Sequence, residues 1–236
     1  MKSRGQKSFI NLPPFAAKLY NSLTQTMGIE HTHQDIARDL VSRIEHGRIL
    51  DVGTGPGKLL REIHRLNPAI QLFGLDISAA MAELARKNLM DIEVDIQCGD
   101  IRHTGYENVF FDIVTCTGSF YMWDNPEECL EEIFRITKPG GSAYLYETHK
   151  DFNACEVREA LRTNLAGENL IRRLVTPFFL RKQLRMTYRT DEVADIVKRT
   201  SFAESYTMAE ICLGGLPAFL RIQLRRSCPP QLMRSA

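Results

Sequence analysis

Residues 49–57 read ILDVGTGPG, an apolar run that ends in a loop with three alternating glycines. Glycine lets the backbone turn sharply and lets a ligand approach where a Cβ would interfere. The next residues, 58–66, have helical character, and a helix N-terminus presents unpaired N–H groups. This order of strand, glycine loop and helix predicts a nucleotide-binding loop in an α/β protein.

Short apolar runs rich in isoleucine and valine alternate with helical segments from residue 48 to about residue 148. Near-continuous apolar strands separated by helices indicate a parallel sheet covered on both faces. Ser78 is suited to cap the second helix, Pro126 to begin the third, and residues 138–141, KPGG, to form the turn before the fifth strand. The predicted strands are 48–52, 70–75, 92–98, 110–116 and 142–146, and the helices between them are 58–66, 78–89 and 126–137.

Two further strand-like runs, 202–213 and 218–224, follow near the C-terminus. Residues 214–217, GGLP, join them and are typical of a hairpin turn, which would place an antiparallel strand on the parallel sheet. We therefore expect an α/β protein with a doubly wound, mostly parallel, seven-stranded sheet of Rossmann-like type and an antiparallel last strand.

The 236 residues are expected to form one domain with appended elements. Thr190 is a candidate cap for a helix over residues 190–199. The expected segments are a helical lid (1–47), a nucleotide-binding core (48–150), an inserted helical cap (151–189), the last helix and strands (190–226) and a tail (227–236).

Composition narrows the classes of function. Hydrophobic residues make up 44% of the chain and charged residues 25%, as in ordinary globular proteins. The net charge of +1 argues against a dedicated nucleic-acid binder, which needs an excess of lysine and arginine. The six cysteines contain no C-x-x-C pair, and the sequence has no signal peptide or membrane span, so we expect a cytoplasmic protein.

Three kinds of nucleotide-binding loop can be compared with residues 53–57. A P-loop fails, because Val52 and Leu59 stand where it needs glycine and serine or threonine. The dinucleotide fingerprint G-x-G-x-x-G is weakened, because Lys58 replaces its third glycine. Asp76, at the end of the second strand, can accept hydrogen bonds from both hydroxyls of a ribose, a geometry shared by nicotinamide and adenosyl cofactors. Its alternative role is to cap the following helix.

A further acid, Asp100, follows the third predicted strand. With the glycine loop, Asp76 and Asp100 in this order, the sequence resembles the class I S-adenosylmethionine-dependent methyltransferases. The resemblance covers residues 48–148, including the fourth strand with its loop at 111–123 and the turn at 135–141, RITKPGG. It is closest to the branch of the ubiquinone and menaquinone C-methyltransferases and many small-molecule enzymes. The resemblance implies S-adenosylmethionine as cofactor and in-line methyl transfer to an O, C or N atom of a small molecule. The alternatives are a nicotinamide-dependent oxidoreductase and a protein that binds adenosylmethionine without catalysis.

The family also implies roles for individual residues. Asp51 would stand behind the glycine loop near the cofactor's ammonium group, or only tie the loop down. Asp76 would bind the ribose, Asp100 would contact the adenine amine or merely cap a turn, and Ile77 and Ile101 would pack on the adenine. The full set of implied cofactor-binding residues is Asp51, Gly53, Thr54, Gly55, Gly57, Asp76, Ile77, Asp100, Ile101, Thr117, Gly118 and Tyr20.

Acceptor-side candidates lie at the C-terminal edge of the sheet, where doubly wound folds bind ligands. Tyr121 and His149 are our catalytic candidates, and Trp123 and Asp124 lie nearby; the alternative is that they form walls. The loop at 117–121, TGSFY, lacks the Asn-Pro-Pro-Tyr motif of enzymes that methylate nucleic acids or amides.

Two other site types are not expected. His31 and His33 have no obvious third ligand, so we predict no metal site. No G-x-S-x-G elbow occurs, which excludes hydrolysis by the α/β-hydrolase route.

The predicted cap is basic, with arginines clustered between Arg158 and Arg189. Such a cluster can be a solvated helix face, it can attract an anionic acceptor, or it can make peripheral contact with an anionic lipid surface. The sequence alone leaves these alternatives open.

Overall fold

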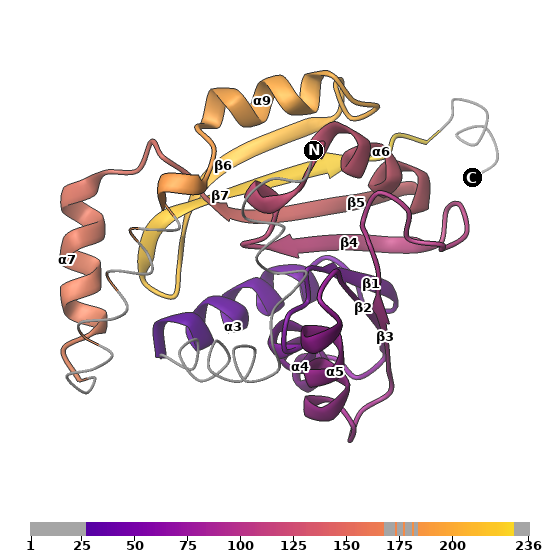
Figure 1. Cartoon of the computed structure of the whole chain (residues 1–236), viewed down its shortest axis with the longest axis horizontal. Helices are drawn as coiled ribbons and strands as arrows, with labels where there is room; N and C mark the ends of the chain where they lie inside the picture. The colour runs from indigo at the N-terminus through magenta and orange to yellow at the C-terminus, as the bar shows by residue number, and fades with distance from the viewer. Residues whose placement is uncertain (1–26, 168–172, 174–176, 178–180, 182–183, 229–236) are drawn as a thin grey trace.

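The structure is a computed structural model that describes residues 27–167, 173, 177, 181 and 184–228. A seven-stranded sheet in the order β3-β2-β1-β4-β5-β7-β6 runs through the molecule (Figure 1). The first five strands are parallel, and β7 runs antiparallel to both β5 and β6. The prediction of a doubly wound sheet with an antiparallel last strand is confirmed. The strands are β1 (Gly47–Val52), β2 (Ile70–Asp76), β3 (Val94–Cys98), β4 (Phe111–Thr117), β5 (Thr137–Thr148), β6 (Tyr206–Leu213) and β7 (Leu216–Arg225).

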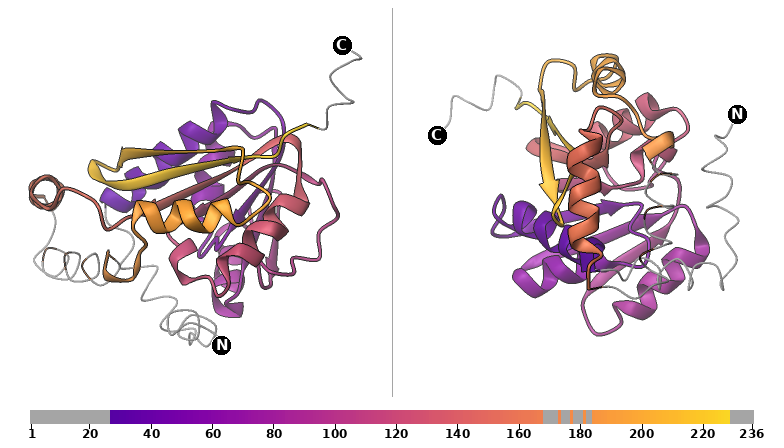
Figure 2. Two further views of the ribbon diagram at one scale, coloured as in Figure 1. Left: turned by 90° about the horizontal axis from the view of Figure 1, so that it is seen from above. Right: turned by 90° about the vertical axis from the view of Figure 1, so that its left-hand side faces the viewer.

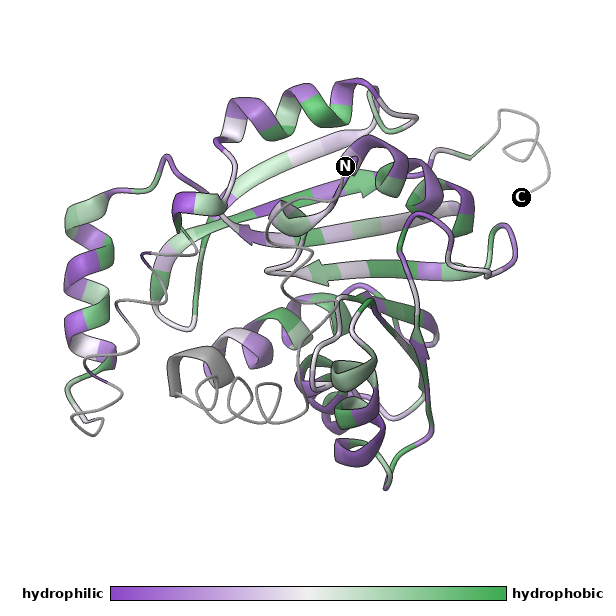
Figure 3. Cartoon of the chain, in the orientation of Figure 1, coloured by the Kyte–Doolittle hydropathy of each residue, from purple (hydrophilic) through white to green (hydrophobic). Residues whose placement is uncertain are grey.

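Helices cover both faces of the sheet, because alternate residues of each strand face opposite cores. Leu50 and Val52 of β1 lie in the core with α6 and α9, whereas Ile49 packs with α3, α4 and α5. Figure 3 shows hydrophobic colouring along β4 and β5 and an amphipathic pattern on α9. The helices are α3 (Met27–Val41), α4 (Lys58–Leu66), α5 (Ala79–Asn88), η1 (Phe120–Met122), α6 (Pro126–Ile136), α7 (Ala154–Asn164) and α9 (Thr190–Lys198).

Helix starts follow local sequence signals at two of the three predicted positions. The Ser78 hydroxyl accepts a hydrogen bond from the Met81 N–H and caps α5, and Pro126 occupies the first turn of α6, as predicted. The prediction that Thr190 caps α9 is wrong. Arg189 is the N-cap and Thr190 is the first helical residue, whose N–H donates to the Asp151 carboxylate at 2.8 Å.

The start of β5 also corrects the prediction. Residues 138–141, expected to be a turn before the strand, belong to β5, which begins at Thr137. Thr137 pairs with Phe111, and the next pair joins Ser142 to Ile113, so the intervening residues bulge out of the ladder. Gly140 has φ 83°, a conformation that glycine adopts without strain, and this lets the strand continue through the bulge.

The hairpin between β6 and β7 is confirmed. Leu213 pairs with Leu216, leaving Gly214 and Gly215 as a two-residue turn with φ 56° and 73°. Two successive positive φ angles are typical of a tight hairpin turn, which explains the paired glycines. The Asn164 amide donates to the Gly214 carbonyl at 2.9 Å, and α7 thereby stands at the end of this hairpin (Figure 2).

Helix α3, from the predicted N-terminal lid, packs against α4 and is anchored to the sheet by Asp39. The carboxylate accepts hydrogen bonds from the Tyr146 hydroxyl at 2.5 Å and from Arg43 at 2.6 Å, and Arg221 lies 3.3 Å away. Burial alone would raise the pKa of Asp39, but these partners outweigh it and the pKa is lowered. None of the described helices is long and apolar enough to cross a membrane.

Arg226, just after β7, closes the C-terminal end of α6. Its Nη1 donates to the carbonyls of Phe134, Arg135 and Thr137 at 2.7, 2.9 and 2.7 Å. Its guanidinium also lies 4.7 Å from the centre of the Phe134 ring. A cation at this position satisfies carbonyls that a helix leaves unpaired.

We therefore predict that Arg226→Met lowers the free energy of unfolding by about 1–3 kcal/mol, the range for hydrogen bonds to a charged group. Chemical denaturation monitored by circular dichroism measures this. The matched control is Arg225→Met, at an exposed position one residue earlier, which should change stability by less than about 0.5 kcal/mol. Equal effects of the two substitutions would contradict the capping role.

Candidate functional site

The glycine loop between β1 and α4 folds back onto the end of β2. The N–H groups of Gly53 and Thr54 both donate to the Leu75 carbonyl, at 2.7 and 3.2 Å. The Gly55 N–H donates to the Asp76 carboxylate at 2.8 Å. These bonds fix the loop at the C-terminal edge of the sheet.

Gly53 allows this loop to pass close to the segment after β4. Its φ is 74°, and a Cβ at this position would come within 2.4 Å of the Ser119 hydroxyl oxygen. Any larger residue at position 53 is therefore both strained and too large.

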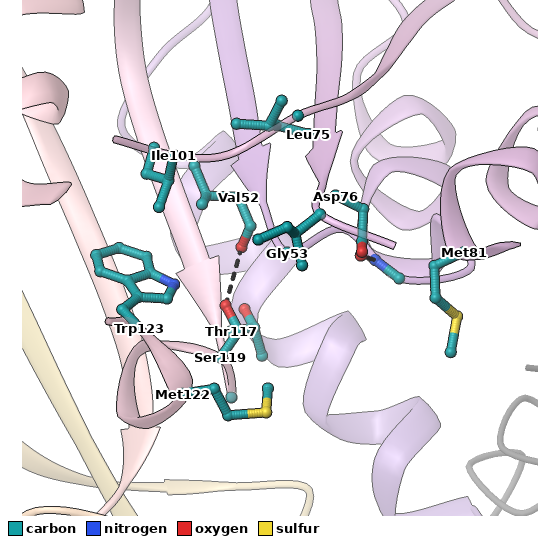
Figure 4. Close-up of a pocket in the computed structure, with 14 residues that line it drawn as sticks. Val52, Gly53, Leu75, Asp76, Met81, Ile101, Thr117, Ser119, Met122 and Trp123 are labelled. Carbon is teal, nitrogen blue, oxygen red and sulfur yellow. Dashed lines mark hydrogen bonds between the residues drawn. The ribbon is translucent and has the colours of Figure 1, made fainter. Parts of the chain in front are cut away.

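The loop forms one wall of a pocket at the carboxyl ends of the parallel strands (Figure 4). The order of the strands reverses between β1 and β4, and such a switch point is where doubly wound folds bind ligands. Most of the lining is apolar, with a few polar groups among it. The lining residues are Val52, Gly53, Gly55, Leu75, Asp76, Ile77, Met81, Gly99, Ile101, Thr117, Gly118, Ser119, Met122 and Trp123.

Asp76 is the one carboxylate among the described residues of this lining. It is 8% exposed, and burial raises its pKa although the N–H groups of Ser78 and Gly55 oppose the shift. The Ser78 N–H donates to Oδ1 at 2.8 Å and the Gly55 N–H to Oδ2 at 2.8 Å. Each carboxylate oxygen can accept about two hydrogen bonds, so both retain capacity for a ligand hydroxyl.

Thr117 contributes a second polar group to the lining. Its hydroxyl is buried and has no hydrogen-bond partner among the described residues. Burying an unpaired hydroxyl is unfavourable, so this atom is a candidate to pair with a ligand in the pocket, and that contact stays a prediction.

Several cofactor-binding predictions coincide with the pocket. The predicted residues that line it are Gly53, Gly55, Asp76, Ile77, Ile101, Thr117 and Gly118. Thr54 is buried behind this wall and Gly57 is the N-cap of α4. Tyr20 lies outside the described residues.

Asp51 lies in β1, 3% exposed, and does not line the pocket. Burial, with a further contribution from the charge of Asp76, raises its pKa to about 7, and the nearby Thr54 side chain opposes the shift. It stands behind the loop as expected, and its contact with a cofactor stays a prediction.

Asp100 lies between two lining residues, Gly99 and Ile101. Its carboxylate is held by Arg102, whose Nη2 lies 2.6 Å from Oδ2 and whose backbone N–H lies 3.0 Å from Oδ1. This is the turn-capping geometry that was the alternative for Asp100, and the adenine contact stays a prediction.

Tyr121 and His149 lie together, but in a second, smaller cavity rather than in the pocket lining. This cavity of about 10 Å³ also contains Glu147, Thr148 and Tyr188 in its wall. His149 is 2% exposed, and its Nδ1 has no hydrogen-bond partner among the described residues. Ser119 lines the pocket and the adjacent Phe120 lines this cavity. A catalytic role for Tyr121 and His149 stays a prediction.

The sequence analysis missed several residues of the site. Met81, Met122 and Ser119 line the pocket, and only their neighbours were predicted. Glu147, 4% exposed in β5, was missed although a charge inside the apolar run AYLYET is a recognisable signal. Burial raises the pKa of Glu147 to about 8, although backbone hydrogen bonds from Phe120 and Ser119 oppose the shift.

Comparison with known protein families matches the central part of the chain. Residues 50–145 match the family described as "Methyltransferase domain". This segment contains the glycine loop, Asp76 and the wall formed by residues 117–123.

Curated relatives match over part of the chain. "Uncharacterized methyltransferase YdaC" of Bacillus subtilis is 30% identical over 95 residues, covering 40% of this chain and 52% of that protein. "Demethylmenaquinone methyltransferase" of Deinococcus radiodurans is 31% identical over 102 residues, covering 42% of each chain. The chain therefore spans about half the length of these relatives.

Solved structures match over nearly the whole chain. A putative S-adenosyl-L-methionine-dependent methyltransferase from Methanococcus maripaludis superposes with a TM-score of 0.70 at 22% identity, covering 93% of this chain and 95% of that one. The plantazolicin methyltransferase BpumL in complex with SAH gives a TM-score of 0.67 at 16% identity, covering 94% of both chains. This protein thus has the class I S-adenosylmethionine-dependent methyltransferase fold, and its residues 50–145 match the methyltransferase domain family.

Proposed function

We propose that this protein is an S-adenosylmethionine-dependent methyltransferase that transfers a methyl group in line to an O, C or N atom of a small molecule. The observation that carries the proposal is Asp76, whose carboxylate is fixed in the pocket wall by Gly55 and Ser78 and keeps acceptor capacity on both oxygens. Relatives named as methyltransferases of demethylmenaquinone and of malonyl-[acyl-carrier protein] support a small-molecule or carrier-bound acceptor.

The residues present fit this cofactor. Asp76 would accept hydrogen bonds from the ribose hydroxyls, and the apolar side chains of Ile77 and Ile101 would pack on the adenine. The unpaired Thr117 hydroxyl and the glycine loop would face the amino acid end. When bound, the cofactor supplies a methyl group on a sulfonium, which is already a good leaving group.

The protein's own contribution is therefore orientation and exclusion of water. Val52, Leu75, Met122 and Trp123 give the pocket apolar walls. Tyr121 is our candidate for contact with the acceptor, and His149 lies behind it in the same small cavity.

Finer features of the acceptor belong to this proposal as well. The exposed Arg158 and Arg162 of α7 favour an anionic acceptor or an anionic lipid surface, whereas Arg172 lies outside the described residues. Nucleic acid is not proposed as a substrate, since the chain has a net charge of +1. Six free cysteines favour a reducing, cytoplasmic compartment.

A labelled-methyl assay tests the proposed activity. Protein incubated with methyl-labelled S-adenosylmethionine and small-molecule extracts should release S-adenosylhomocysteine (SAH) and label a low-molecular-weight product. Binding of SAH without turnover in any extract would favour the non-catalytic alternative. Tight binding of NAD without binding of SAH would favour the oxidoreductase.

Asp76→Ala should weaken SAH binding by about ten- to a hundredfold or more, because charge-assisted hydrogen bonds to the ribose contribute about 1.5–3 kcal/mol. Isothermal titration calorimetry measures the effect. Asp95→Ala, an exposed substitution in β3, is the control and should bind SAH normally. An unchanged affinity for Asp76→Ala would reassign this residue to holding the loop and helix α5.

Thr117→Val should weaken ligand binding without lowering the stability of the free protein. It removes a buried unpaired hydroxyl, so the melting temperature without ligand should stay equal or rise. SAH affinity should fall by about two- to twelvefold, the equivalent of one hydrogen bond of about 0.5–1.5 kcal/mol.

Thr115→Val is the matched control two residues earlier. The Thr115 hydroxyl does not line the pocket and is paired, because it donates to the Tyr144 carbonyl at 3.1 Å. This variant should therefore lose stability and keep its SAH affinity. If Thr117→Val behaves in the same way as Thr115→Val, the Thr117 hydroxyl does not contact the ligand.

A further inference from the structure

Glu147 is a buried acid that none of the roles above uses. One carboxylate oxygen, Oε1, accepts hydrogen bonds from the N–H groups of Ser119 and Phe120, at 2.9 and 2.8 Å. The preceding N–H, that of Gly118, donates to the Tyr146 carbonyl at 3.0 Å. Three consecutive N–H groups after β4 are therefore held by two adjacent residues of β5.

This segment continues directly into the pocket wall. The Met122 and Trp123 N–H groups donate to the carbonyls of Ser119 and Phe120, at 3.0 and 3.1 Å, and form the single turn η1. The Phe120 ring packs edge-on against the Trp123 ring, with 5.1 Å between the centroids. Displacing the backbone at residues 119–120 would therefore move both Met122 and Trp123, which line the pocket.

The second carboxylate oxygen has a different environment. Oε2 is buried and has no hydrogen-bond partner among the described residues, and Glu147 lines the small cavity together with His149. A protonated carboxyl suits this asymmetry, because its carbonyl oxygen accepts the two N–H groups while its O–H points away from them. The raised pKa of Glu147, which follows from its burial, is consistent with this state at neutral pH.

We propose that Glu147 is a positioning residue for the methyltransferase site, which shapes the pocket wall at residues 117–123 through the backbone of Ser119 and Phe120. The expected effect of Glu147 on ligand binding rests on the proposed function. The expected effect on the pocket wall does not, because it can be measured without any ligand.

Two substitutions separate hydrogen bonding from packing. Glu147→Gln keeps a carbonyl oxygen for the two N–H groups and resembles the protonated acid in shape. Glu147→Leu keeps a similar volume and removes the acceptor, leaving the N–H groups of Ser119 and Phe120 buried and unpaired. Glu131→Leu, at an exposed position of α6, is the control, because its carboxylate accepts the Ser201 N–H and hydroxyl, both at 2.7 Å, and neither residue lines the pocket.

Trp123 provides a readout without ligand, because it is the only tryptophan in the chain and lies in this wall. We expect Glu147→Leu to shift the tryptophan emission to longer wavelength and to increase quenching by acrylamide. Glu147→Gln and Glu131→Leu should leave both unchanged. A wild-type emission spectrum for Glu147→Leu would overturn the proposal.

SAH binding by calorimetry at pH 7 gives the second readout. We expect Glu147→Gln to bind within about threefold of the wild type and Glu147→Leu to bind at least about tenfold more weakly. Equal weakening in both variants would mean that charge, not the backbone contact, matters, and would also overturn the proposal. If the wild type does not bind SAH, the proposed function fails, whereas the fluorescence result still decides the role of Glu147.

The pH dependence keeps the proposal testable if Glu147→Leu does not fold. A carboxyl whose pKa is about 8 in the folded protein contributes stability that is fully present below its ordinary value of 4.5 and is lost as the pH rises from there to about 8. The wild type should therefore lose more stability between pH 6 and 9 than Glu147→Gln does. Equal losses would contradict a buried, protonated Glu147.

Other titratable groups near Glu147 are present in both the wild type and Glu147→Gln. The difference between their losses of stability with pH therefore reports on position 147 alone. Cys116 faces it from β4, with a thiol pKa raised well above its ordinary value by burial. Tyr121, His149 and Tyr188 share its cavity.

Discussion

The Asp76 carboxylate is the contact on which the rest of the site depends. Its two oxygens accept N–H groups from Gly55 and Ser78, so one side chain at the end of β2 joins the glycine loop to the start of α5. Glu147 does the same at the end of β5 for the segment after β4. Two buried acidic side chains thus fix the opposite walls of the pocket through backbone N–H groups.

Such a pocket suits the chemistry proposed for it. A methyl group on a sulfonium needs an acceptor held in line and a site without competing water, more than it needs a strong acid or base. The described walls are mostly apolar, and their polar groups are few: the Asp76 carboxylate and the buried Thr117 hydroxyl have defined places. A rigid wall at residues 117–123 would keep the acceptor side aligned with the cofactor side.

Local sequence patterns made the glycine loop and the position of Asp76 predictable. The run ILDVGTGPG specified a strand, a tight loop and a helix, and Asp76 follows from its place at the end of the next buried strand. The features that were missed depend on contacts between distant segments. The bulge in β5 depends on its pairing with β4, and the small cavity around His149 forms only when β5 meets the segment after β4. Glu147 belongs to this last group, since its partners lie 27 and 28 residues away in the chain.

The most direct test of this account is a crystal structure of the full chain with SAH. The account predicts SAH in the pocket at the carboxyl ends of β1, β2 and β4, with both ribose hydroxyls within hydrogen-bond distance of the Asp76 oxygens and the adenine between Ile77 and Ile101. SAH bound elsewhere, or bound in this pocket with its ribose turned away from Asp76, would contradict it.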